Sequence, residues 1–216
     1  MFNKKKAATV PIQIRETLFG DMALADWSAH QGEPWTTFAE AKRYLDAKQP
    51  ATGIETLQAI TTRAGLESRH YLQAWHFLRQ LGVNPTDAQA KTLYGVVVEV
   101  AMDKGLDIVA AYADLSARYY NYSGAGIVWE HPDQSLDAEI EALLSAGRVV
   151  VGQIGPWKQA RPPAPTHGQV RLTMLTPGGL HFGQGSFEIL AADPLGGSLI
   201  TAATRLMQAL IAKRQK

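Results

Sequence analysis

The sequence contains no cysteine, and this excludes disulfide bonds, cysteine-ligated zinc, iron–sulfur clusters and thiol catalysis together. Net charge is also scarce, because 21 Lys and Arg against 20 Asp and Glu leave +1. A disordered chain would combine high net charge with low hydrophobicity, whereas 46% of these residues are hydrophobic. We therefore expect the chain of 216 residues to fold around a sizeable hydrophobic core.

Long apolar runs are missing too. No uninterrupted run approaches the ~20 residues that cross a bilayer, and Glu99 interrupts the longest one, at residues 96–101. Three lysines stand at positions 4–6, but Pro11 ends the short apolar stretch that follows them, unlike a signal peptide. These features predict a cytoplasmic protein with no membrane contact.

Several catalytic motifs are absent. The chain has neither the Gly-x-Ser-x-Gly elbow of α/β-hydrolases nor the Gly-x4-Gly-Lys-Ser/Thr phosphate loop. Helical metal ligands usually stand four residues apart, whereas His70 and His76 are six apart and so point to different sides of a helix. We predict no metal site and no cofactor.

Composition and charge both change along the chain. Six glycines precede residue 105 and thirteen lie from there onward. Residues 148–216 hold eight Lys and Arg against two acids, a net charge of +6 that the total conceals. The two halves therefore differ in local structure, and a basic surface is expected on the second.

The first half has helical patterns. Thr37 and Glu40 form the sequence signature of a capping box, which starts a helix that reaches about Lys48. A second helix opens at Pro50 and ends at Gly65, and a third spans residues 67–81. Short loops between the three require antiparallel packing. We expect an arm at residues 1–33, with a candidate edge strand at 10–14, then a three-helix segment at 34–83.

Residues 84–216 are predicted to form an α/β sandwich that shares a core with these helices. A helix over 86–104 precedes strands at 107–113, 118–122 and 127–130. A helix ending at Gly147 follows, then strands at 149–154, 170–174 and 180–182, and a final helix from about Ser198. The expected class is α+β: N-terminal antiparallel helical hairpins packed on a mainly antiparallel sheet that is flanked by helices. This order of elements resembles the profilin-like or roadblock-type sandwich, in outline only, so no residue role is carried over.

A proline-rich connection, residues 155–168, is the first candidate binding segment. Its prolines hold the chain extended, and a stiff segment loses little conformational freedom on binding. Trp and Arg are the residue types that anchor interfaces. The segment is either a recognition loop or a stiff crossover with its Trp on the core. Its candidate binding residues are Trp157, Arg161, Pro162, Pro163 and His167.

Two further clusters are candidates. Residues 177–179 form a turn, and Gly178, Gly179 and His181 could approach a ligand, with the alternative that His181 is structural. Arg118, Tyr120 and Tyr122 lie on one strand, where Tyr120 and Tyr122 share a face that is either core or an exposed aromatic patch.

Three functions remain open. The absence of catalytic motifs favours a non-enzymatic protein-interaction or regulatory module, with a protein partner or a second copy as its ligand. The alternative is a hydrolase or nuclease for a phosphorylated substrate, in which His181 and His167 would be the catalytic candidates. Nucleic-acid binding is the third hypothesis, and we expect it least because the basic charge is spread over 69 residues.

Overall fold

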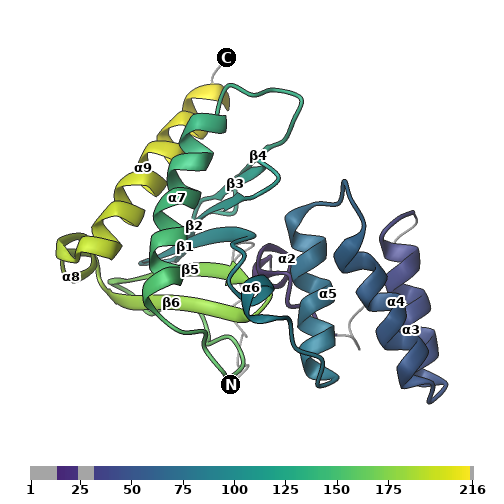
Figure 1. Ribbon diagram of the computed structural model, residues 1–216. Helices are drawn as coiled ribbons and strands as arrows, with labels where there is room; N and C mark the ends of the chain where they lie inside the picture. Colours follow the sequence, from purple (N-terminus) through teal and green to yellow (C-terminus); the bar gives the residue numbers. More distant parts are fainter. Residues whose placement is uncertain (1–13, 24–31, 215–216) are drawn as a thin grey trace, which may run out of the picture.

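The computed structural model describes residues 14–23 and 32–214, and these contain eight helices and six strands (Figure 1). The helices are α2 (Arg15–Phe19), α3 (Trp35–Asp46), α4 (Pro50–Thr62), α5 (Ser68–Gln80), α6 (Asp87–Ala90), α7 (Asp137–Gln153), α8 (Phe187–Ala192) and α9 (Pro194–Arg214). The strands are β1 (Gly95–Met102), β2 (Gly105–Tyr112), β3 (Ala117–Tyr120), β4 (Gly126–Trp129), β5 (Gln169–Thr176) and β6 (Gly179–Ser186).

The strands form one antiparallel sheet in the order β4-β3-β2-β1-β5-β6. Helices stand before and after the strands, which confirms the expected α+β class. Helices α7 and α9 lie side by side on one face of the sheet, while α3, α4 and α5 lie to the other side (Figure 1). The central strand β1 is covered on both faces.

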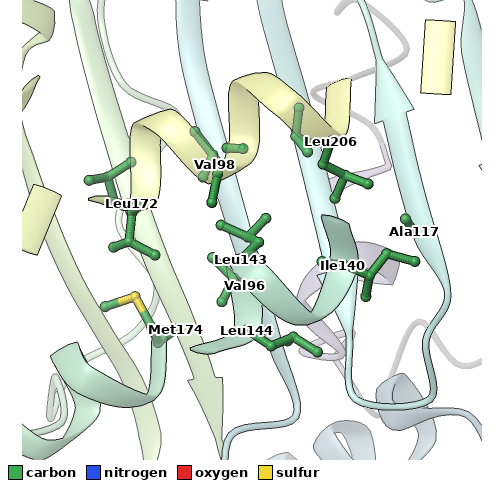
Figure 2. Close-up of a cluster of buried hydrophobic side chains, with 14 of the residues drawn as sticks. Val96, Val98, Ala117, Ile140, Leu143, Leu144, Leu172, Met174 and Leu206 are labelled. Carbon is green, nitrogen blue, oxygen red and sulfur yellow. The ribbon is translucent and has the colours of Figure 1, made fainter. Parts of the chain in front are cut away.

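The face under α7 and α9 carries the larger apolar core. Figure 2 shows Val96 and Val98 of β1 pointing toward Leu143 and Leu144 of α7 and toward α9. Side chains two apart on a strand share a face, so the β-branched valines meet the helices at each second position. This packing fixes the register of β1.

The opposite face is covered by α2 and α5. Leu18 of α2 and Leu72 of α5 pack there against Val97 and Leu106. A third cluster, centred on Phe38, Phe77 and neighbouring side chains, joins α3, α4 and α5 to one another. The three helices follow the ranges predicted from sequence within a few residues.

The predicted helix over 86–104 is wrong. Only residues 87–90 are helical, and residues 95–102 form β1. A run that is apolar on all sides fits a strand buried on both faces as well as a buried helix, and valine favours the strand. Thr86 caps the short helix α6, because its side chain accepts a hydrogen bond from the Gln89 N–H.

The predicted break at Gly147 is also wrong. Helix α7 continues to Gln153, so residues 149–154 do not form the expected strand. Gly147 lies inside the helix because a Cβ there would stand 2.6 Å from Val96 Cγ2. The glycine lets α7 approach the sheet closely rather than end there.

Smaller differences concern helix ends. The Thr37–Glu40 capping box does not form, because Glu33 accepts hydrogen bonds from Thr36 and Thr37 instead. The final helix starts at Pro194 rather than Ser198. The candidate edge strand at 10–14 falls almost entirely outside the described residues, and Ile14 itself precedes α2.

Helix α9 is long and apolar enough, over residues 194–213, to cross a membrane by length and composition. Core helices of soluble proteins meet the same criterion. About 33% of this window is buried, and Leu199, Leu206 and Leu210 belong to the core beneath α7 and α9.

Candidate functional site

A cleft of about 630 Å³ opens between α5, the first half of the proline-rich segment and the turn before β6. It brings together candidates from two of the predicted clusters, namely Trp157, Arg161, Gly178 and Gly179. Cavities of this size commonly receive small ligands or anchoring side chains. The other lining residues are Phe19, Gly20, Asp21, Leu72, His76, Arg79, Gln80, Asn84, Pro156, Lys158, Gln159, Ala160, Thr176 and Leu180.

Trp157 forms one wall of the cleft. Its backbone N–H donates to the Leu180 carbonyl at 2.6 Å, and its indole N–H donates to the Ala160 carbonyl at 3.1 Å. The ring meets Phe182 edge-on at 5.3 Å, while 40% of the residue stays exposed. A fixed and partly exposed indole offers apolar contact area at little cost in conformational entropy.

Arg161 is held by a carboxylate. Its Nε and Nη2 donate to the two Asp21 oxygens at 2.5 and 3.0 Å, and its guanidinium lies 4.6 Å from the centre of the Phe19 ring. Both ionic side chains are largely buried. The pair ties the segment to the chain just after α2, so Arg161 supports one wall of the cleft and neutralises its carboxylate.

Arg79 lies in the same cleft without such a partner. Its guanidinium donates to the Pro177 carbonyl, and no carboxylate of the described residues lies within ion-pair distance of it. Burial lowers the pKa of Arg79 from its usual value, and Asp21 opposes that shift from a distance. A partly desolvated cation whose hydrogen-bond partner is neutral attracts an anion more strongly than a solvated one does.

The lining as a whole is positive. Arg79, Lys158 and Arg161 stand against the single carboxylate of Asp21, a net charge of +2 with His76 neutral. Burial lowers the pKa of His76, with Arg79 and Arg161 acting in the same direction and Asp21 against it. The neutral ring contacts Gln80 Nε2 at 3.0 Å through its Nε2. The cleft therefore suits an anionic group beside an apolar one.

The two prolines of the candidate set have a structural position. The Pro162 carbonyl accepts hydrogen bonds from Arg15 at 3.4 Å and from Arg171 at 3.3 Å, and Pro163 is exposed. Both arginines are buried beside Glu99, which is 0% exposed, with Arg15 Nε 2.5 Å from a Glu99 oxygen. This buried ionic cluster holds the segment on the sheet.

The two candidate histidines do not meet. His181 is buried opposite Met174, on the face that α7 and α9 cover, and its Nδ1 has no hydrogen-bond partner. His167 is exposed at the far end of β5, with Nδ1 3.1 Å from Asp103 Oδ1. Five residues of strand separate their positions, at least ~15 Å. They cannot act on one substrate group.

The third candidate cluster, Arg118, Tyr120 and Tyr122, is mostly buried. Arg118 is buried and donates to Glu130 at 2.6 Å as well as to the Ala117 and Trp129 carbonyls. Tyr120 packs against the core under α2, whereas Tyr122 is 45% exposed and lines a smaller cavity with His167. These residues do not reach the cleft.

Sequence reasoning missed Asp21, His76, Arg79 and Lys158 as parts of the site. A signal existed for Arg79, since it stands in the apolar stripe of α5, seven residues after Leu72. A charge at such a position needs a partner or a cleft. No metal site of three or more His, Asp or Glu side chains occurs in residues 14–23 and 32–214.

Comparison with known proteins adds no relative: no family model, no curated protein and no solved structure matches this chain.

Proposed function

We propose that the protein is a non-enzymatic interaction module whose cleft receives an acidic segment of a protein partner. The observation that supports this most is Arg79, a partly buried cation in the cleft with a neutral carbonyl as its hydrogen-bond partner. A partner carboxylate would pair with it, and the exposed part of Trp157 would cover an adjacent apolar side chain. Arginine and tryptophan are enriched at the energetic centres of such interfaces.

Electrostatics would guide the encounter. Lys158 is exposed at the rim of the cleft, where a charge mainly affects the association rate and its salt dependence. Arg79 lies deeper, so its pairing would affect the dissociation rate. The partner therefore binds less tightly as salt rises, and the two cations contribute through different rate constants.

Site-specific photocrosslinking tests the proposal. A photoreactive residue replaces Gln159 in the cleft, and a control replaces Ser145 on the outer side of α7; both positions are exposed. In extracts of the source cells, we expect a protein adduct at 159 and not at 145. Lys158→Glu should reduce that adduct about tenfold, the effect of ~1.4 kcal/mol. The matched reversal Lys104→Glu, on the turn between β1 and β2, should leave it unchanged.

The result that overturns the proposal is equal labelling from both positions, or an adduct that is insensitive to Lys158→Glu and to Arg79→Gln. Turnover of phosphate esters that Arg79→Gln abolishes would instead favour the hydrolase hypothesis, because the same cations would then hold a phosphate.

A further inference from the structure

Strand β6 leaves one edge of the sheet open. It pairs with β5 on one side, and on the other the Trp157 N–H donates to the Leu180 carbonyl in an antiparallel bridge. Among the described residues, this bridge is the one backbone hydrogen-bond contact made on the outer edge of β6. Backbone groups of a strand alternate in direction, so those of Phe182 and Gln184 also point outward. The edge is therefore ready to accept a strand beyond the point where Trp157 stops.

Beyond the Trp157 bridge, the open edge lacks the charges, prolines and bulges that usually prevent pairing. Natural edge strands carry charges, prolines or bulges, or they are very short. β6 has eight residues, and its sequence contains no charged residue and no proline. The opposite edge differs, because β4 has four residues and is followed directly by Glu130, His131 and Pro132. β6 is therefore the less protected of the two edges.

Exposed apolar side chains flank this edge. Phe187 and Ile189, on the helix that follows β6, are 49% and 69% exposed. Trp157, at the other end, is 40% exposed. Apolar side chains that lie around an unpaired edge indicate a protein contact rather than a solvated surface. A partner strand would cover both the backbone and these side chains.

We propose that the occupant is β6 of a second copy, paired antiparallel about a two-fold axis at Gln184. A two-fold axis places Gln184 opposite its own copy and each other residue opposite the one equally far from Gln184 on the second chain, so charges of one sign along the edge would face each other. β6 has no Asp, Glu, Lys or Arg, so no such charges face each other in this register. The two sheets would join into one.

The register brings the flanking side chains together. With Gln184 opposite its copy, Phe187 is level with residue 181 of the second chain, next to the end where that chain holds its own Trp157. Each exposed aromatic at one end thus meets the exposed aromatic of the other end. Backbone pairing through Phe182, Gln184 and the Ser186 N–H would supply about four hydrogen bonds.

Sedimentation velocity of the purified chain from 1 to 100 μM tests this, because we expect a dimer within that range. Phe187→Asp and Ile189→Asp change exposed positions and should weaken the dimer at least tenfold while the monomer keeps its circular dichroism spectrum. Val128→Asp is the matched control, since Val128 is 55% exposed on the other edge strand.

Hydrogen exchange locates the interface. The Phe182 and Gln184 amides should exchange more slowly as the dimer forms, in proportion to its population. A monomer at 100 μM overturns the proposal, as does a dimer that Val128→Asp weakens and Phe187→Asp does not. Protection of these amides that needs a different protein overturns it as well, because the edge then serves a heterologous strand.

Discussion

Replacing Glu99 by glutamine should lower the free energy of unfolding by about 3–5 kcal/mol, the usual cost of breaking a buried ion pair from one side. Glu99 is fully buried on the central strand β1 and holds Arg15 at 2.5 Å, with Arg171 at 3.7 Å. Both arginines are themselves more than nine-tenths buried. Glutamine keeps the size and removes the charge, so two guanidinium groups would share the site without a carboxylate. The loss is large because the charges cannot regain water without opening the sheet face.

Urea unfolding followed by tryptophan fluorescence measures the change. With a slope of ~1–3 kcal/mol per molar urea, the midpoint should fall by at least ~1 M. Glu141→Gln is the matched control, because the Glu141–Arg148 pair is half-exposed and such pairs contribute at most ~1 kcal/mol. The joint replacement Arg15→Met, Glu99→Leu and Arg171→Met should restore most of the stability. A Glu99→Gln protein as stable as Glu141→Gln would refute the reasoning.

Three other predictions concern a buried histidine, two glycines of α7 and the proline-rich segment. Burial, with Lys91 acting in the same direction, lowers the pKa of His181. On acidification the unfolded chain therefore binds a proton at this histidine before the folded chain does, so stability is lost as the pH falls below ~6.5. The urea midpoint of His181→Phe should decline less between pH 7.5 and 5.5 than that of the unmodified protein. Thermal unfolding should show that Gly147→Leu destabilises the protein by at least ~1–3 kcal/mol through its clash with Val96. Gly152→Ala, in open space on α7, should stabilise the protein by ~0.5–1 kcal/mol in that assay. Arg161→Met should release the proline-rich segment and speed trypsin cleavage after Lys158, and an unchanged cleavage rate would show that the Asp21 pair does not hold it.

The fold class could be predicted from sequence because long segments with a clear hydrophobic period indicate their secondary structure reliably. Helices α3, α4 and α5 and strands β2, β5 and β6 match patterns of period 3.6 or 2. The prediction for residues 96–100 was wrong because a strand that is buried on both faces shows no hydrophobic periodicity. Its short length and β-branched residues were the better guide, and they favour a strand.

The glycine at 147 misled for a related reason. A glycine after an apolar helical pattern indicates a helix end only when the backbone turns left-handed there. Gly147 is absent from the residues with positive φ, and its lack of a side chain serves the contact between α7 and β1. Close packing of this kind depends on a residue 51 positions away, which local reasoning does not see.

The candidate site was predicted only in part. Trp157, Arg161 and the turn glycines do line one cleft, but the cleft also needs Asp21 and Arg79, from segments more than 75 residues earlier. Pairing of Arg161 with Asp21 cannot be derived from either neighbourhood. The sequence identified residue types suited to an interface, and tertiary structure decided which of them face outward.

The short helix α2 has a consequence for how the molecule folds. Five residues are too few for a stable isolated helix. Its contacts, and those of Asp21 beside it, reach partners 84, 140 and 147 positions away along the chain. Such distant contacts become favourable only after the intervening chain is ordered. We therefore expect the sheet to form before α2 docks on it. When the protein begins to unfold, we expect α2 to detach early and expose the face beneath it to water.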